Sequence, residues 1–263
     1  MTFQPVVPLT GYSGWAFLNR TMESQKEAFN ESSNIRRDTD YFKENIGSIE
    51  TAEDLMSDRR LLSIALGAFG LNEDIGNTYF IQKVLTDGTV DDDALANKLS
   101  DKSYLEFSKA FGFGDFGSPN TTLSEFPDKI IAKYQDTQFE IAIGEQDDSM
   151  RLALNLDREL ATIANKGTSS NGAWYGVMGN TAVRTVFETA LGLPTSIGSL
   201  DLEQQLTAFR EKSERYFGDS EVSQFATSDK REELVRLFLV RSEITQGNVG
   251  NSAAQNALTL LSS

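Results

Sequence analysis

A short phrase occurs twice in this sequence and constrains the fold more than any other feature. AFGLNEDIGN, residues 68–77, and ALGLPTSIGS, residues 190–199, carry Ala, Gly, Leu, Ile and Gly at the same places, 122 residues apart. Around the start of each phrase, apolar residues follow the spacing i, i+3, i+4, i+7 and i+8, which lays one stripe along a helix. The two stripes are Leu61, Ile64, Ala65, Ala68 and Phe69 in the first copy and Val183, Val186, Phe187, Ala190 and Leu191 in the second. We therefore predict the same amphipathic helix twice.

A glycine follows the last apolar residue of each stripe. Gly70 and Gly192 are suited to the left-handed backbone that ends a helix. Leu71 and Leu193 come next, where a Schellman-type helix end places an apolar residue against the last turn. Pro194 also prevents the second helix from continuing. Both helices are thus predicted to stop in the same way.

A second helix is expected after each glycine. Asn77 and Ser199 are suited to cap these helices, because a short polar side chain can accept from the free N–H groups of the first turn. Phe80 and Val84 would face the core in the first copy, and Leu202 and Leu206 in the second. The unit is a helix, a glycine corner and a helix. Helical spacing dominates the chain, so the predicted fold is all-α and multi-helical.

Terminal helices are expected to surround the two units. The expected segments are an N-terminal extended stretch and helix in 1–53, the first unit with connecting helices in 54–164, the second unit in 174–245 and a tail in 246–263. A weaker extension of the repeat pairs Asp101-Lys102 and Phe111 with Asp229-Lys230 and Phe238, with six residues inserted in the second copy. The loop NKGTSSNGAW, residues 165–174, is short, so one compact domain is expected overall.

Net charge and hydropathy limit the partners. The formal charge of −15 repels phosphate backbones and anionic lipids, so no nucleic-acid partner is expected. No run of 18 apolar residues is present, so no integral membrane segment is expected. The start MTFQPVVPLTGYSGW lacks the basic and apolar regions of a cleaved signal peptide, which predicts synthesis in the cytoplasm without such a peptide.

Histidine and cysteine are both absent. Their absence removes thiolate nucleophiles, histidine bases, Ser-His-Asp triads and the usual zinc sites. We therefore predict no catalytic, cofactor-binding or metal-binding residue, and a protein that is not an enzyme. An enzyme that uses carboxylates or an oxygen-ligated metal is the alternative that composition leaves open.

The acidic run DGTVDDDALANKL, residues 87–99, has the alternating oxygens of a calcium loop. It lacks glycine at the sixth loop position and glutamate at the twelfth, where Asp92 and Lys98 stand. A helix that starts with an acidic first turn at Asp91–Asp93 is favoured over a calcium site. GFGDFG, residues 112–117, lacks the context of a nucleotide loop and is interpreted as a glycine-broken aromatic loop.

Aromatic and basic side chains offer further candidates. Trp174 and Tyr175 could form an exposed binding spot, but aromatic residues at the start of such a unit more often anchor it to its neighbours. Arg184 and Arg210 show no spacing that distinguishes a phosphate clamp from ordinary surface charge.

The termini are the nominated partner surfaces. Their apolar stripes are Trp15, Leu18, Met22 and Phe29 at one end and Ala257, Leu258 and Leu261 at the other. Docking on the chain's own core is the alternative, favoured for the first helix. For the tail, exposure is favoured, because its stripe is narrow, rich in alanine and follows the glycine-rich link QGNVGNS.

The sequence resembles the family named domain of unknown function 1217. The resemblance is carried by RRLLSIALGAFGLNEDIGNTYFIQKVL and LANKLSDKSYLEFSKAFGF in the first half, and by WYGVMGNTAVRTVFETALGLP, LDLEQQL and RLFLVRSEI in the second. Members of this family occur largely in flagellar gene clusters of alphaproteobacteria. The resemblance therefore implies flagellar assembly or motility, and a protein partner such as a flagellar component. A cytosolic adaptor for an exported flagellar subunit is the second reading.

Overall fold

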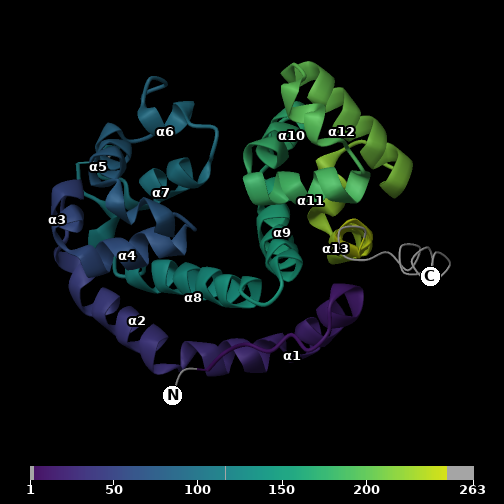
Figure 1. Ribbon diagram of the computed structural model, residues 1–263. Coiled ribbons are helices and arrows are strands. Elements are labelled where there is room, and N and C mark those ends of the chain that lie inside the picture. Colours follow the sequence, from purple (N-terminus) through teal and green to yellow (C-terminus); the bar gives the residue numbers. More distant parts are fainter. Residues whose placement is uncertain (1–2, 116, 248–263) are drawn as a thin grey trace, which may run out of the picture. The chain divides into compact units, whose positions relative to one another are not determined.

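The computed structural model describes residues 3–115 and 117–247, and these residues form helices and connecting turns (Figure 1). No strand occurs among them, which confirms the predicted all-α, multi-helical fold. None of the helices in the described ranges is long and apolar enough to span a bilayer.

The described part of the chain divides into two compact units. Among the described residues, unit 1 contains residues 3–6, 20–115 and 117–145, and unit 2 contains residues 7–19 and 146–247. The division falls in the acidic bend between α8 (Phe126–Gly144) and α9 (Asp148–Asn165). There Asp147 caps α9 by accepting from the N–H groups of Ser149 and Met150. The loop at residues 165–174 lies inside unit 2. Polar residues at the bend lack the apolar stripe that would carry one helix through both units.

Unit 1 holds most of the helices of the first half. They are α2 (Ser33–Asn45), α3 (Ala52–Ser57), α4 (Arg59–Ala68), α5 (Thr78–Asp87), α6 (Leu95–Lys98), α7 (Ser103–Phe111) and α8 (Phe126–Gly144), with the 3-10 helices η1 (Ile46–Ser48), η2 (Asn72–Gly76) and η3 (Asn120–Thr122). Helix α4 packs against α8. An aromatic cluster forms the nearby core, with the ring of Phe111 lying 5.1 Å from those of Phe107 and Phe126.

Unit 2 holds the helices of the second half. They are α9 (Asp148–Asn165), α10 (Ser170–Gly179), α11 (Thr181–Leu191), α12 (Leu202–Phe217) and α13 (Ser228–Gly247), with η4 (Thr195–Ser199) and η5 (Val222–Ala226). Helix α1 (Gly11–Asn30) has residues in both units. Helix α11 packs against α13 and α9. The rings of Trp174, Phe187 and Phe225 fill the centre in edge-to-face contacts.

The two glycine corners have the predicted backbone. Gly70 and Gly192 have φ angles of +73° and +63°. The N–H of Leu71 donates to the Leu66 carbonyl at 3.0 Å, and that of Leu193 donates to the Glu188 carbonyl at 2.9 Å. These bonds are the long closures of a Schellman end. Pro194 follows the second closure and precedes η4.

The two segments around these corners share an order of elements. A helix, a glycine, a 3-10 turn and a second helix follow one another in α4–η2–α5 and in α11–η4–α12. Nine of the ten stripe residues are buried, and Phe69 is half-buried. That the segments superpose as one repeat stays a prediction. Overlaying residues 55–85 on residues 177–207 would test it.

The predicted cap at Ser199 is wrong. Ser199 ends η4, and the cap of α12 is Asp201, whose carboxylate accepts from the N–H of Gln204 at 2.8 Å. The 3-10 turn delays the start of α12, so the aspartate reaches the free N–H groups instead. Asn77 precedes α5 as predicted but makes no capping bond with its side chain.

Candidate interaction surface

The apolar stripe of the first helix is largely covered by the chain itself. Trp15 and Leu18 are buried, and the indole Nε1 of Trp15 donates to a Glu232 carboxylate oxygen at 2.9 Å. Phe29 is buried edge-to-face against Phe139, and Met22 is half-buried. These side chains therefore offer a partner little surface. The other nominated residues, Ala257, Leu258 and Leu261, lie outside the described residues.

The acidic run at residues 87–99 is organised by a carboxylate that sequence analysis missed. Asp115, in the glycine-rich loop, accepts from the N–H groups of Thr89 and Val90, and its second oxygen accepts from the Thr89 hydroxyl at 2.8 Å. The expected acidic first turn is also displaced, because α6 begins only at Leu95 and the three aspartates form the turn before it. The loop holds its own backbone, and the described residues contain no acidic cluster of metal-binding size.

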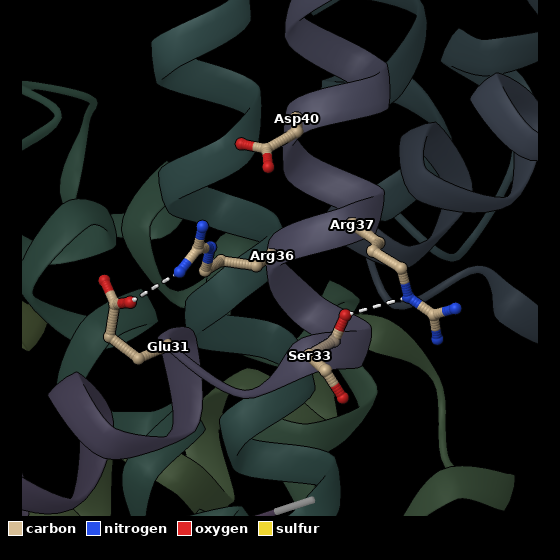
Figure 2. Close-up of a pocket in the computed structure, with 5 residues that line it drawn as sticks. All are labelled: Glu31, Ser33, Arg36, Arg37 and Asp40. Atoms are coloured by element: carbon tan, nitrogen blue, oxygen red, sulfur yellow. Dashed lines mark hydrogen bonds and ion pairs between the residues drawn. The ribbon is translucent and has the colours of Figure 1, made fainter. Parts of the chain in front are cut away.

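A shallow polar depression of about 320 Å³ lies at the start of α2 (Figure 2). The Arg36 guanidinium pairs with Glu31 at 3.5 Å, and the Nε of Arg37 donates to the Ser33 carbonyl at 3.0 Å. The two arginine side chains extend in different directions, and Asp40 adds a second acid to the lining (Figure 2). Two arginines and two acids leave the depression without a net charge. It therefore lacks the convergent cations of an anion site.

The aromatic pair of α10 serves unit 2. Trp174 is fully buried, and its Nε1 donates to the Ser220 carbonyl at 2.9 Å. The Tyr175 hydroxyl donates to Glu203 at 3.0 Å. Of the two arginines considered from sequence, Arg184 pairs with Glu188 at 2.7 Å. These polar groups already have partners within the unit.

Arg210 has the same character. Its guanidinium lies 3.4 Å from a Glu221 carboxylate oxygen and also donates to the Ser170 hydroxyl, which in turn donates to Glu221. The three side chains join α12, α10 and the residue before η5. Arg210 is therefore a structural tie between elements of unit 2.

Tyrosine hydroxyls reveal an electrostatic pattern. Five of the seven tyrosines donate to a carboxylate: Tyr12 to Glu232, Tyr41 to Asp58, Tyr104 to Asp74, Tyr134 to Asp38 and Tyr175 to Glu203. These contacts raise the pKa of each tyrosine, with burial as the largest cause for Tyr104 and Tyr134 and the hydrogen bond for the others. In an acidic chain, tyrosine thus serves repeatedly as the donor that satisfies a carboxylate.

Tyr216, in the last turn of α12, has the opposite environment. The Arg241 guanidinium lies 4.6 Å from its ring centre, and that of Arg215 lies 6.0 Å away. A hydrogen bond from Arg241, together with the charges of Arg241, Arg215 and Lys212, lowers the pKa of Tyr216. No ion pair joins any of these three cations to a carboxylate in the described chain. A local positive cluster therefore stands on an acidic protein.

The position of Arg241 is fixed by the glycine corner. Its Nη1 donates to the Ala190 carbonyl at 2.6 Å, at the end of α11. That carbonyl is one of the groups that a helix end leaves without an intrahelical partner. Satisfying it places the guanidinium over the Tyr216 ring. The cluster is thus built on the α11 corner.

Exposed apolar side chains share α13 with Arg241. On α13, Val240 is 42% exposed and Ile244 is 61% exposed, and Tyr216 is 38% exposed. Ile244 lies three residues beyond Arg241, so the two are neighbours on the helix surface. We define the Tyr216 face as Lys212, Arg215, Tyr216, Val240, Arg241 and Ile244.

A sequence signal for this face exists in α13. The run LVRLFLV, residues 234–240, has more apolar residues than one helix face can bury. Leu234, Val235, Phe238 and Leu239 are buried, whereas Val240 is left outside. The surplus marks an apolar position that unit 2 does not cover.

The model of a family described as proteins of unknown function, DUF1217, matches residues 68–230. The chain belongs to this family. The matched range covers both glycine corners and all of α12, while Val240, Arg241 and Ile244 lie beyond it. No curated protein matches this DUF1217 chain.

A solved structure resembles this DUF1217 protein over nearly its whole length. It is the X-ray crystal structure of protein AGR_C_984 from Agrobacterium tumefaciens, which is 27% identical in sequence. The alignment covers 92% of this chain and 99% of that chain, with a TM-score of 0.75. The helical architecture is therefore shared with an experimentally determined protein.

Proposed function

We propose that the chain is a non-enzymatic interaction or assembly protein associated with the bacterial flagellum or with motility. The single observation that carries the proposed interaction role is the Tyr216 face. It combines exposed apolar side chains with cations that have no carboxylate partner in the described chain. Tyrosine, arginine and exposed apolar side chains that lie close together have the composition of many protein interfaces.

The composition of the face supports protein recognition. Tyrosine and arginine are enriched at interface centres, because each gives a large contact area together with hydrogen bonds. Tyr216 and Arg241 are stacked, and Arg241 is anchored at Ala190. An anchored pair loses little side-chain entropy when a partner binds.

The proposed setting rests on the family resemblance. Members of the family occur largely in alphaproteobacterial flagellar gene clusters, which favours a role in building or operating the flagellum. Within that setting the protein would be either a part of the flagellar assembly or a cytosolic adaptor for an exported subunit. Both roles require a surface for another protein, so the Tyr216 face serves either.

Cell fractionation separates these roles. Motile cells that carry an epitope-tagged full chain are divided into cytosol and purified flagellar basal bodies, and each fraction is probed for the protein. Recovery with basal bodies supports an assembly part, whereas recovery in cytosol bound to an exported flagellar subunit supports the adaptor. Recovery in cytosol without any flagellar protein, combined with normal swimming of a deletion strain, would contradict the proposed setting.

An enzyme remains the alternative of a different class. It would require converging carboxylates or an oxygen-ligated metal in a concave site. Calorimetric titration of the full chain with Mg²⁺, Mn²⁺ or Ca²⁺ tests this alternative. A saturable metal site together with turnover of a substrate would reverse the ranking.

A further inference from the structure

We propose that the Tyr216 face binds an acidic amphipathic helix of a partner protein. The carboxylates of that helix would meet Lys212, Arg215 and Arg241, and its apolar residues would cover Val240 and Ile244. This inference rests on the proposed interaction function and names the chemistry of the partner.

Charge complementarity identifies the sign of the partner. The chain carries a formal charge of −15, yet three cations gather around Tyr216 without ion pairs in the described residues. Lys212 and Arg215 are three residues apart and lie on one side of α12. A carboxylate-bearing segment is attracted by these three cations, whereas the net charge of the chain repels it. Local charge therefore directs an acidic partner to this face.

The rigidity of Arg241 makes the site more than a group of mobile charges. Its guanidinium donates to the Ala190 carbonyl at 2.6 Å and lies over the Tyr216 ring at 4.6 Å. Arginine presents several donors in one plane, which suits a carboxylate. A side chain already held in place binds with less loss of conformational freedom.

The apolar part of the face is suited to a helix. Val240 and Ile244 are four residues apart on α13, so they project from one side about 6 Å apart along the axis. A second helix offers apolar residues at the same spacing when it lies along α13. An acidic segment with apolar residues at i, i+3, i+4 and i+7 thus matches both halves of the face.

A protein segment is favoured over a phosphate-bearing surface. Membranes and nucleic acids present phosphates over wide areas, and a chain of charge −15 is repelled by such surfaces. A single acidic helix is small enough to contact only the cations around Tyr216. The acidic remainder of this protein then stays away from the negative charges of the partner. Anionic vesicles are nevertheless included in the test.

Fluorescence anisotropy with two designed peptides tests the electrostatic half. The probes are labelled helices of equal length with leucines at the same positions, one carrying Glu and the other Lys at the flanking positions. The full chain should bind the Glu probe and not the Lys probe, and added salt should weaken binding. Lys212→Gln with Arg215→Gln should weaken binding about tenfold, because two rim charges are lost.

Matched variants separate the face from general charge and folding. Lys109→Gln with Lys129→Gln removes two exposed cations from unit 1 and should leave binding unchanged. Ile244→Ser should weaken binding several-fold through lost apolar contact, whereas Tyr79→Ser, at a residue that is 80% exposed in unit 1, should not. Circular dichroism and thermal unfolding verify that each variant is folded.

Three results would overturn the inference. They are equal binding of the two probes, no difference between the Lys212/Arg215 and Lys109/Lys129 variants, and binding of vesicles of anionic phospholipid at the Tyr216 face in place of the Glu probe. Any of these results leaves the fractionation experiment unaffected. A protein recovered with basal bodies that ignores the Glu probe would keep its proposed function and lose this partner.

Discussion

The two glycine corners share a backbone but differ in the group that satisfies the helix end. At the first corner, the Ala68 carbonyl accepts from the Thr137 hydroxyl at 3.3 Å in the interior of unit 1. At the second, the corresponding Ala190 carbonyl accepts from the Arg241 guanidinium at 2.6 Å. Both solve the same problem of an orphan carbonyl. The donor at the first corner is a neutral hydroxyl, whereas the donor at the second is an arginine, which brings a cation to the surface of unit 2.

The glycines show the same contrast. A methyl group added at Gly70 would meet nothing within 4 Å, whereas one added at Gly192 would lie 2.7 Å from Nη1 of Arg241. The first glycine is required only for its left-handed backbone. The second also makes room for the side chain that orders the Tyr216 face. A similar sequence therefore provides only a helix end in one unit, whereas in the other unit it provides a helix end that also binds an arginine side chain.

The two corners should differ most in how much stability is lost when the last apolar residue of each stripe is truncated. Leu191 is fully buried, and its counterpart Phe69 is half-buried beside Phe107 and beneath Lys133. Leu191→Ala should lower the free energy of unfolding by about 3 kcal/mol through lost burial and a cavity, and Phe69→Ala by about half as much. Denaturant unfolding measures both. Equal losses would show that the corners bury their last apolar residue equally well.

The glycines come next in expected effect. Gly192→Ala should lower the free energy of unfolding by about 2 kcal/mol, because it combines positive φ with displacement of Arg241. Gly70→Ala should cost about 1 kcal/mol through backbone strain alone. Thermal and denaturant unfolding of the two variants give the comparison. If Gly70→Ala lowers the free energy of unfolding more than Gly192→Ala does, the inference that Gly192 makes room for Arg241 is wrong.

The helices that follow the corners should differ by a smaller amount. Asp201 caps α12 through the Gln204 N–H, and Asp201→Ala should cost about 1 kcal/mol of unfolding free energy. Asn77 makes no such bond, so Asn77→Ala should cost a few tenths of a kcal/mol at most. Both variants can be measured in the same unfolding series. A cost at Asn77 equal to that at Asp201 would contradict the assigned caps.

Titration of tyrosine should distinguish the two corners, because the pKa of the tyrosine near each corner is shifted in the opposite direction. Tyr104 donates to Asp74 in η2, and burial with this carboxylate raises its pKa, whereas Arg241 lowers the pKa of Tyr216. Because the pKa of Tyr104 is raised in the folded chain, this tyrosine stabilises the folded state at pH values below the ordinary pKa of tyrosine. The contribution is lost as the pH rises through the raised pKa. Tyr216 has the opposite dependence on pH. It stabilises the folded state at pH values above the ordinary pKa of tyrosine, and this contribution is lost as the pH falls through the lowered pKa.

Absorbance of tyrosinate in the folded chain measures both shifts. Tyr216→Phe should remove signal from the early part of the alkaline titration, and Tyr104→Phe should remove signal from the late part. Arg241→Gln should move the Tyr216 signal to higher pH. An unchanged early signal in Tyr216→Phe would show that the cations do not act on this hydroxyl.

The features predictable from sequence were those set by neighbouring residues. Gly70 and Gly192 follow apolar stripes, and helix periodicity with a glycine stop is a local rule. The cap at Asp201 was missed because η4 lengthens the turn in a way that the preceding residues do not reveal. Local pattern thus defines the helix end but not the start of the next helix.

The candidate site could not be predicted from patterns of neighbouring residues. Arg241 reaches a carbonyl 51 residues earlier in the chain, and no spacing rule connects the two. The stripe at Trp15 and Leu18 was visible, but an apolar stripe does not specify whether the chain or a partner covers it. Only tertiary packing shows that these residues are buried while Val240 and Ile244 are not.

The Asp115 contact has a consequence for attack by proteases. Val90 is 76% exposed, and exposure in a loop normally marks a cleavage site. The backbone N–H groups of Thr89 and Val90 are nevertheless held by Asp115, and a protease must pull this segment into an extended form before it can cut. The loop should therefore resist digestion for as long as the carboxylate holds it. Nicking at this loop would report the release of Asp115 rather than the exposure of Val90.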